Sequence, residues 1–472
     1  MKQQLFIGGE WQEGNNYQDL TSPFSEKVIA HIPMASLEEV DRAVEAAVSA
    51  KYVMKKLPAY KRAEILENVV KLLEENREKC ARIIAEEAAK PIQTARAEVA
   101  RTIMTYKFAS EEARRLPNEM VNMDAAPGGE DRIAYVLREP GGVVGAITPF
   151  NFPMNLVAHK LGPAIASGNP VILKPASQTP LSAYFIADLF DKAGLPKGAL
   201  NVITGKGNIV GEALITDPRV NIITFTGSPE VGISIKNKAG LKKVTLELGS
   251  NSAVIIDHDV NIDELIDRIV MGAFGYQGQV CISLQRIYVH ETLKEELISK
   301  LKEKSKALQL GDPLDEATNI SALITPSDCE RVLSWIEEAV SLGAKVATGG
   351  ERIGNIIQPT IMIDPPSNTS VSCKEVFGPV VTVNGFTDWS DAIAEVNNSE
   401  FGLQAGVFTS NLSKAFQASD DLEVGGVMIN DIPTFRVDHM PYGGVKKSGF
   451  GREGIKYAIE EMTEMKLVSF KR

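Results

Sequence analysis

Four short apolar runs follow one another between residues 171 and 248: VILK (171–174), LNVIT (200–204), NIITF (221–225) and VTLEL (244–248). The segments that separate them carry helical patterns, at 181–193, 209–216 and 231–238. Short apolar runs that alternate with helices are typical of βαβ units, in which consecutive strands lie parallel in one sheet. This part of the chain therefore predicts an α/β fold with a parallel sheet.

A second alternation of the same kind occupies the C-terminal half. Its strands are predicted at 253–257, 286–289, 405–408 and 427–430, and its helices in the 260s and at 291–308, 327–342 and 390–398. The chain has 472 residues, whereas a single hydrophobic core stops growing at about 250–300 residues. We therefore expect two α/β domains, with a boundary near Gly249.

The first quarter of the chain is mostly helical. A capping box at 36–39 opens one helix, and a second helical pattern runs from Pro58 to Lys90, where Pro91 interrupts it. The pattern changes to extended segments at 131–148.

Composition limits the partners and the compartment. The formal net charge of −11 provides no basic surface for nucleic acid or an anionic membrane. No run reaches the roughly 18 apolar residues of a membrane span, and the N-terminus lacks the apolar core of a secretory signal. Four distant cysteines without metal-ligand spacing argue against disulfides and structural zinc, so a cytoplasmic protein is expected.

Two glycine-rich turns follow predicted strands. Residues 205–211 form GxGxxxG, one residue longer than the dinucleotide fingerprint, and residues 226–232 (TGSPEVG) place a tight turn before a helix. The N-terminus of a helix presents free amides and a positive dipole end to a phosphate. The alternative is an ordinary strand-to-helix turn with a serine cap and a proline at the first helical position. Neither turn carries GK[ST], so a P-loop is not supported.

Three side chains are candidates for catalysis. Cys281, in GQVC, is either a small buried side chain or a nucleophile. Glu247 ends an apolar strand, and it is either solvated there or buried with a pKa raised towards the range of a general base. Asn151, in TPFNFP, is either an amide donor for an oxyanion or a turn residue beside proline. Each residue taken alone leaves both interpretations open.

These segments belong to a set of motifs that occur in one order. They are TPFNFP (148–153), LKPAS (173–177), FTGSPEVG (225–232), LELG (246–249), GQVC (278–281) with Arg286 five residues on, EVFGPV (375–380) and PYGGVKKSGFGREG (441–454). From about residue 5 to its end, the chain resembles the NAD(P)-dependent aldehyde dehydrogenase superfamily. The resemblance implies a Rossmann-like cofactor domain (1–120 and 141–248), an α/β catalytic domain (249–440) and a β-strand oligomerisation arm (121–140 and 455–472).

The resemblance also implies a mechanism. Cys281 attacks the aldehyde, and the Asn151 amide and the backbone N–H of Cys281 hold the oxyanion of the thiohemiacetal. Hydride transfer to the nicotinamide leaves a thioester, which water activated by Glu247 hydrolyses to a carboxylic acid. Lys160 and Glu453 match positions linked to proton relay near this base. No metal is required.

The implied cofactor is NAD or NADP. The resemblance assigns Lys174 and Glu375 to the two riboses and Phe377 to the nicotinamide ribose. The full set of matching positions is Ile147, Thr148, Pro149, Lys174, Ser177, Gly227, Ser228, Gly232, Leu248, Glu375 and Phe377. Ser177 stands where strongly NAD-preferring members often carry glutamate. Because serine does not repel a 2′-phosphate, NADP is expected to be tolerated.

The substrate is implied less sharply. The positions that match the aldehyde tunnel of the family are Phe150, Phe152, Asn155, Ile282, Phe435, Arg436 and His439. Arg436 either anchors a carboxylate, phosphate or sulfonate at the tunnel mouth or forms a surface ion pair with Asp431 or Asp438. A small polar or anionic aldehyde is expected, of the lactaldehyde or succinate-semialdehyde kind, with glyceraldehyde 3-phosphate and sulfolactaldehyde as alternatives.

Two other functions compete with hydrolytic oxidation. A CoA-acylating dehydrogenase usually lacks a glutamate matching Glu247, and a non-catalytic binding protein on this fold has no need of Cys281, Glu247 and Asn151 together. The resemblance further implies that subunits exchange strands through 121–140 and the C-terminal MKLVSF segment. A homodimer or homotetramer is therefore expected, with no nucleic-acid or membrane partner.

Overall fold

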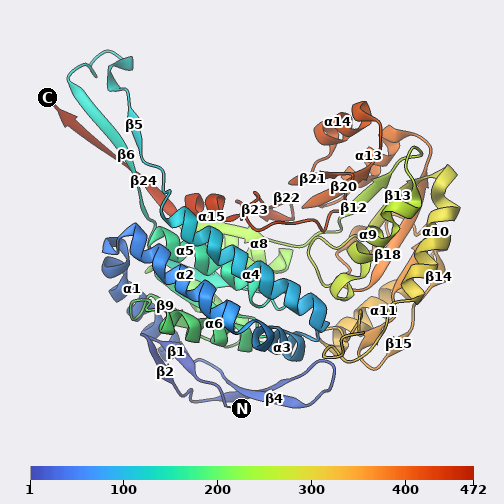
Figure 1. Ribbon diagram of the computed structural model, residues 1–472, viewed down its shortest axis with the longest axis horizontal. Helices are drawn as coiled ribbons and strands as arrows, with labels where there is room; N and C mark the ends of the chain where they lie inside the picture. The colour runs from blue at the N-terminus through green and yellow to red at the C-terminus, as the bar shows by residue number, and fades with distance from the viewer. Residues whose placement is uncertain (1) are drawn as a thin grey trace.

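Two sheets organise the computed structural model, which describes residues 2–472 (Figure 1). The first sheet has eight strands in the order β2-β1-β9-β8-β7-β10-β11-β23, and its five central strands, β9 to β11, are mutually parallel. Its strands are β1 (Leu5–Ile7), β2 (Glu10–Gln12), β7 (Val143–Ile147), β8 (Val171–Lys174), β9 (Leu200–Val202), β10 (Val220–Thr226), β11 (Lys243–Glu247) and β23 (Gly449–Phe450). The parallel sheet predicted from the apolar runs is confirmed.

Helices cover both faces of this sheet, which explains why its strands are apolar throughout. On β8, Val171 and Leu173 belong to the core on the side of α5, whereas Ile172 points into the core on the side of α1. The helices of this half are α1 (Leu37–Lys56), α2 (Ala59–Glu75), α3 (Arg77–Ala88), α4 (Ile92–Ala113), α5 (Asn155–Ser167), α6 (Leu181–Lys192), α7 (Glu212–Thr216), α8 (Pro229–Lys238) and α15 (Ile455–Glu461).

Two helical predictions need correction. The pattern from Pro58 to Lys90 is not one helix, because Asn76 leaves helical geometry (φ −113°, ψ 18°) and its side chain donates to the carbonyl of Leu72 at 2.8 Å. Asparagine competes with the backbone in this way and so favours helix ends. The segment 209–216 is likewise divided, into a π-helical turn at Gly207–Gly211 and the short α7. The capping box before α1 is present as predicted.

The second sheet has seven strands in the order β14-β17-β18-β13-β12-β20-β21, parallel except for β14. On β12, Val254 and Ile256 pack towards α9 and α10, whereas Ala253 and Ile255 pack towards α13 and α14. Its strands are β12 (Ala253–Ile256), β13 (Arg286–His290), β14 (Lys345–Thr348), β17 (Thr360–Ile363), β18 (Val380–Phe386), β20 (Gln404–Phe408) and β21 (Gly426–Ile429). Its helices are α9 (Ile262–Phe274), α10 (Glu291–Lys306), α11 (Pro326–Ser341), α13 (Trp389–Asn397) and α14 (Leu412–Asp421).

A three-stranded arm extends from the body and ends near the C-terminus (Figure 1). It consists of β5 (Glu119–Val121), β6 (Arg132–Pro140) and β24 (Thr463–Lys471), and β24 pairs with β6 over nine residues. Residues 455–461 form α15, which packs on α5 and α4, so the strand itself begins after this helix. Several apolar side chains are exposed on the arm, among them Met120, Met465, Leu467 and Phe470.

Minor elements complete the fold. They are β3 (Tyr17–Thr21), β4 (Val28–Pro33), β15 (Arg352–Ile353), β16 (Ile356–Ile357), β19 (Phe401–Gly402), β22 (Val445–Lys446), α12 (Ser370–Cys373) and two 3₁₀ turns at Met123–Ala125 and Gly275–Gly278. Across residues 2–472, no helix combines the length and apolarity that a membrane span requires.

Candidate active site

A cavity of about 340 Å³ opens beside Cys281. Its wall is formed by residues from α4, the start of α5, the turn after α9 and the segment 434–442. Five positions predicted for the aldehyde tunnel border it, namely Phe152, Asn155, Ile282, Phe435 and Arg436. Segments far apart in the sequence therefore meet around one thiol.

A strained turn presents Cys281 to this cavity. The three residues Tyr276, Gln277 and Gly278 all have positive φ, at 50°, 53° and 70°. A Cβ on Gly278 would overlap the carbonyl oxygen of Gly378, so only glycine fits there. Gln277 anchors the turn by donating to two backbone carbonyls, each at 3.0 Å. Backbone strain of this kind persists only where the surroundings enforce it, and it is common at functional sites.

The Cys281 thiol is partly exposed to the cavity and lies 3.1 Å from the hydroxyl of Tyr442. Burial raises the pKa of this thiol to about 11, although the hydrogen bond with Tyr442 and the charge of Arg436 act in the opposite direction. The resting group is therefore a thiol and needs a base before it can act as a nucleophile.

Glu247 ends β11 and is 3% exposed. Neither of its carboxyl oxygens has a hydrogen-bond partner within the described residues. Burial raises the pKa of this carboxyl well above its usual range, and the nearby negative charge of Glu453 raises it further. A Cβ on Gly443 would lie 3.0 Å from Glu247 Oε1, so the segment that carries Tyr442 passes directly against this carboxyl group.

Asn151 is buried, and its amide donates to the carbonyl of Gln279, two residues before Cys281, at 3.0 Å. One amide hydrogen is committed to this bond, so the second is available to an oxyanion next to the thiol. The Asn151 Oδ1 atom has no partner in the part of the chain that the structure describes. The geometry is consistent with the predicted donor role.

Lys160 and Glu453 form a buried ion pair, with 3.1 Å between Nζ and Oε1. The other carboxylate oxygen of Glu453 accepts from Arg436 Nη2 at 3.0 Å. Burial opposes ionisation of Glu453, but these two cations lower its pKa to about 2. The site thus holds two carboxyl groups in different states, an ionised Glu453 and a Glu247 that favours its protonated form.

Arg436 does not form the surface ion pair with Asp431 or Asp438 that the sequence left as an alternative. Its side chain is 6% exposed, its guanidinium stacks 3.6 Å from the ring centroid of Tyr442, and its partner is Glu453. Asp431 and Asp438 are already engaged elsewhere: Asp431 accepts from Arg268, and Asp438 accepts from Arg101, Asn155 and His159. The pairing with Asp431 or Asp438 was therefore wrong.

Two other positions predicted for the substrate, Phe150 and His439, are not among the described residues that line this cavity, and their roles stay predictions. His439 is exposed and packs against Phe108, with ring centroids 4.7 Å apart. Phe150 packs instead against Phe377, at 5.7 Å. The neighbouring Asp438 points inward, which leaves the next side chain facing outward.

The predicted cofactor residues gather at the carboxyl ends of adjacent parallel strands, where α/β sheets bind their ligands. Ile147 ends β7 and residues 148–149 follow it, Lys174 ends β8, Gly227 and Ser228 follow β10, and Leu248 follows β11. Ser228 caps α8 by accepting from the backbone N–H of Val231. A Cβ on Gly232 would lie 2.4 Å from Leu248 Cδ2, so a larger residue at this position would displace the Leu248 side chain.

Side chains at this edge retain unused hydrogen-bonding capacity. The buried Lys174 ammonium donates to one acceptor, the carbonyl of Pro175 at 3.2 Å, and burial lowers its pKa to about 8. The Thr148 hydroxyl is buried without a partner in the described structure. Glu375 accepts from the backbone N–H of Ser250 at 3.0 Å, and burial raises its pKa to about 7. These groups fit a ligand rich in hydroxyl groups, such as the two riboses of a dinucleotide.

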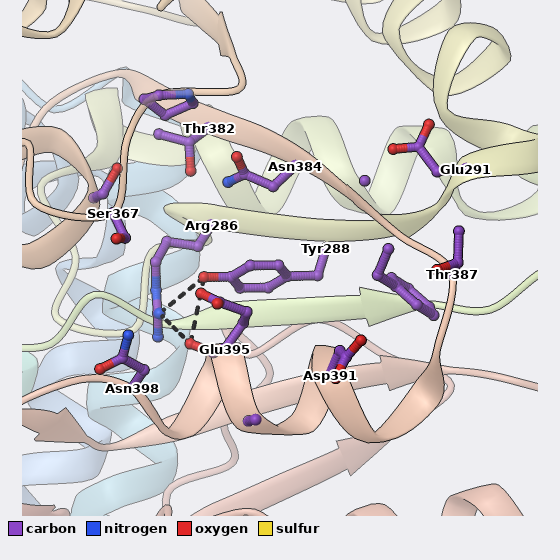
Figure 2. A pocket seen from close by; sticks show the side chains of 15 residues that line it. Arg286, Tyr288, Glu291, Ser367, Thr382, Asn384, Thr387, Asp391, Glu395 and Asn398 are labelled. Atoms are coloured by element: carbon purple, nitrogen blue, oxygen red, sulfur yellow. Dashed lines mark hydrogen bonds between the residues drawn. The ribbon is translucent and has the colours of Figure 1, made fainter. Parts of the chain in front are cut away.

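Arg286 belongs to a separate hollow of about 590 Å³ on the second sheet (Figure 2). Its guanidinium donates to the Tyr288 hydroxyl at 3.2 Å and to the carbonyl of Glu395 at 3.1 Å, so it is already satisfied. Cysteine does not occur among the described residues that line this hollow. The lining therefore offers no thiol nucleophile. The hydrogen bonds of Arg286 connect parts of the backbone, and its role is structural.

Sequence reasoning missed three residues of the site. Tyr442 lies within a quoted motif, next to the glycines of PYGG, and was the only one with a local signal. Lys90 donates to the carbonyl of Asn151, and Arg101 borders the cavity while it binds Asp438. Neither residue belongs to a motif that would distinguish it from other charged residues of the chain.

Comparisons with known proteins agree with this geometry. The chain matches the sequence model of the aldehyde dehydrogenase family over residues 11–468. It is 46% identical to the 3-sulfolactaldehyde dehydrogenase of Priestia megaterium, over 98% of this chain and 97% of that protein. It is 42% identical to the lactaldehyde dehydrogenase of Methanococcus aeolicus, over 98% and 99%. The crystal structure of glyceraldehyde-3-phosphate dehydrogenase GapN from Methanocaldococcus jannaschii, complexed with NADP, is 40% identical and superposes with a TM-score of 0.93, over 97% of this chain and 100% of that chain.

Proposed function

The chain belongs to the aldehyde dehydrogenase family, and we propose that it oxidises a three-carbon 2-hydroxyaldehyde bearing an anionic group to the corresponding carboxylic acid. The reaction class, NAD(P)-dependent oxidation of a small aldehyde, is that of its relatives. Sulfolactaldehyde, lactaldehyde and glyceraldehyde 3-phosphate, which name the three proteins compared above, share a three-carbon 2-hydroxyaldehyde skeleton. Two of the three carry an anionic group at the third carbon.

The observation that carries the anionic preference is the buried guanidinium of Arg436 in the wall of the Cys281 cavity. An arginine has five N–H donors, and the contact with Glu453 uses one nitrogen of the group. Its Nε atom is buried without a partner among residues 2–472. Sulfonate, phosphate and carboxylate oxygens accept hydrogen bonds of this kind strongly. Arg101 and Arg268 line the same wall, and each is paired with an aspartate.

The proposed chemistry uses three side chains in sequence. Glu247, when ionised, takes the proton from Cys281, and the sulfur attacks the aldehyde carbon to form a C–S bond. The carbonyl oxygen becomes an oxyanion, which the Asn151 amide and the backbone N–H of Cys281 stabilise. A nicotinamide cofactor, held by the residues named below, would supply the hydride acceptor, and loss of the hydride would leave a thioester on the Cys281 sulfur.

Water then completes the reaction. Glu247 first gives up the proton that it took from Cys281, and it then removes a proton from a water molecule, which attacks the thioester carbon. The C–S bond breaks, the carboxylic acid leaves, and the sulfur recovers a proton from Glu247 to restore the Cys281 thiol. Lys160 and Glu453 form an ion pair beside this base. This pair can relay the proton away from Glu247. The buried carboxyl at position 247 favours hydrolysis over transfer to CoA.

We assign the cofactor to the groove at the ends of β7, β8, β10 and β11. Lys174 and Glu375 would hold the riboses, and the turn at Gly227 and Ser228 would receive the pyrophosphate at the N-terminus of α8. Ser177 presents a hydroxyl at the adenosine end, where it donates to the carbonyl of Gly205 at 3.4 Å. The absence of a carboxylate at this position supports acceptance of NADP as well as NAD.

The parts of the chain can also be given roles in cofactor binding, catalysis and assembly. We propose that 1–120 and 141–248 bind the cofactor, that 249–440 carries the nucleophile, and that 121–140 and 455–472 join subunits. The apolar side chains exposed on the arm support a homodimer or homotetramer. All four cysteines of the described chain carry free thiols, which suits a reducing compartment such as the cytoplasm.

A substrate panel tests the proposal. Purified enzyme would be assayed with sulfolactaldehyde, glyceraldehyde 3-phosphate, succinate semialdehyde, lactaldehyde and propanal, each with NAD and NADP. The anionic three-carbon substrates should give the highest kcat/KM. Arg436→Ala should lower the ratio of kcat/KM for an anionic substrate to that for propanal at least about tenfold, since each tenfold step corresponds to about 1.4 kcal/mol of lost binding. An equal loss on propanal would contradict an anion anchor, and retained activity in Cys281→Ser would contradict the mechanism.

A further inference from the structure

The Cys281 sulfur forms a hydrogen bond with the side chain of Tyr442. The two atoms Sγ and Oη are 3.1 Å apart, and the tyrosine is 2% exposed. Its ring packs with Ile282 and Leu403 in a small apolar cluster, and so it is fixed in position. The hydroxyl therefore points at the sulfur from a rigid support.

The direction of this hydrogen bond follows from chemistry. A phenol O–H is a strong donor, whereas a thiol S–H is a weak one. After the sulfur loses its proton it has no hydrogen to give, so in the nucleophilic state only the tyrosine can donate. Hydrogen bonds to an ionised acceptor are also stronger than those to a neutral one.

Arg436 strengthens this donor from the face of the tyrosine ring. Its guanidinium lies 3.6 Å from the centroid of the tyrosine ring. A cation over an aromatic ring is attracted to its π electrons, and it withdraws electron density from the attached O–H group. Among the charged groups around the sulfur, the cation of Arg436 favours the thiolate. The carboxylates of Glu375 and Glu247 oppose it.

We propose that Tyr442 is a catalytic residue of this site: its hydroxyl donates a hydrogen bond to the Cys281 thiolate and stabilises the nucleophile before it attacks the aldehyde. This inference rests on the proposed function, in which Cys281 is the nucleophile. The thiol proton goes to a Glu247 oxygen, the sulfur electron pair forms the C–S bond, and the C=O electron pair moves to oxygen. Tyr442 keeps its own proton throughout and acts only as a donor.

The test measures the thiol itself. Tyr442→Phe removes the hydroxyl and keeps the ring, and the enzyme without aldehyde would be alkylated with iodoacetamide between pH 7 and pH 10. Mass spectrometry of the Cys281 peptide then gives the rate at that one site. Loss of a hydrogen bond to a charged group should raise the pKa of the Cys281 thiol by about 1–2 pH units. Because this pKa already lies above the assayed range, the effect is read from the alkylation rate at each pH. A more basic thiolate is also more nucleophilic, so the alkylation rate should fall by about 3- to 20-fold.

Two controls accompany this variant. Tyr288→Phe removes another buried phenol hydroxyl on the second sheet (Figure 2), and it should leave the Cys281 rate unchanged. Cys373, the other partly exposed thiol of the described chain, provides an internal reference in every sample. An unchanged Cys281 rate in Tyr442→Phe overturns the proposal.

A folding defect would be visible as new reactivity of the buried Cys80 and Cys329. In that event Tyr442→3-fluorotyrosine decides the question, because fluorine makes the phenol a stronger donor at nearly the same size. The Cys281 rate should then rise, and a rate that is unchanged or lower overturns the proposal. Failure of the proposed function is a separate result, namely aldehyde oxidation that survives in Cys281→Ser.

Discussion

Lys90 donates a hydrogen bond from its buried ammonium group to the backbone carbonyl of Asn151, at 2.6 Å. The same ammonium pairs with Glu98, whose second carboxylate oxygen accepts from the backbone N–H groups of Met154 at 2.9 Å and Asn155 at 3.2 Å. One buried ion pair therefore holds both ends of the turn that carries the oxyanion donor. The Lys90 ammonium also lies 3.7 Å from the centroid of the Phe152 ring, which borders the cavity.

Removing this cation should affect both stability and catalysis. Lys90→Met leaves the Glu98 carboxylate buried without its partner, and we expect a loss of about 3–5 kcal/mol in the free energy of unfolding, measured with urea. The double variant Lys90→Met with Glu98→Gln should recover most of that stability. Its kcat should stay at least about tenfold below wild type, because the Asn151 carbonyl has lost its anchor. Full recovery of kcat in the double variant would show that the pair is only structural.

Glu247→Gln separates the two halves of the reaction. Glu247 acts first on the thiol and then on water, so the variant should form the thioester when assayed above pH 9, where more of the thiol ionises without its help. We expect a burst of NAD(P)H close to one equivalent per site, followed by a steady rate about 10²–10⁴-fold below wild type. Stopped-flow absorbance at 340 nm measures both phases. A steady state without a burst would place the defect before hydride transfer.

The acid limb of the pH–rate profile should report the Glu247 carboxyl. Burial and the charge of Glu453 raise its pKa, so kcat should fall as the pH drops and the base becomes protonated. Glu453→Gln removes that neighbouring charge and frees the cations of Lys160 and Arg436, both of which favour ionised Glu247. The acid limb of kcat should therefore move to lower pH in this variant. A shift to higher pH would contradict the assignment.

Asp438 should contribute stability that depends on pH. Burial opposes its ionisation, but His159 and Arg101 hold its pKa well below the ordinary value. A carboxyl with a lowered folded-state pKa stabilises the protein above its unfolded pKa of about 3.9, and this contribution is lost as the pH falls below that value. Asp438→Asn should cost about 2–4 kcal/mol at pH 7 by urea unfolding, and the difference from wild type should shrink below pH 4. A difference that does not depend on pH would mean that the charge is unimportant.

Local patterns predicted the parts of this fold that local interactions determine. The alternation of apolar runs and helices located four parallel strands in each sheet, because burial between two helical layers leaves an apolar run in the sequence. It did not locate β14, β17 and β18 of the second sheet. One predicted helix is divided by a single residue: Asn76 ends it through its own side chain, which periodicity alone does not reveal.

The ion pairs of the site could not be predicted from the sequence, for a different reason. The partner of Arg436 was sought in Asp431 and Asp438, its near neighbours in sequence, whereas the structure pairs it with Glu453. That carboxylate reaches the site because β23 returns the chain to the edge of β11, next to Glu247. Lys90 meets Asn151 across 61 residues of sequence in the same way. Such pairs follow from tertiary packing, and no spacing rule in a single sequence encodes them.

The choice of cofactor should turn on position 177. Ser177 presents a hydroxyl beside the glycine turn, and its Oγ donates to the carbonyl of Gly205 at 3.4 Å. Ser177→Glu places a carboxylate there, which would accept from the ribose hydroxyls of NAD and repel the 2′-phosphate of NADP. We expect the ratio of kcat/KM for NADP to that for NAD to fall by about 100-fold or more, with a smaller change for NAD itself. Ser177→Ala is the matched control, since it removes the hydroxyl without adding charge, and it should change the ratio less than about tenfold. A wild-type preference for NAD above about 1000-fold would contradict the role given to serine at this position, because a neutral hydroxyl supplies no repulsion of that size.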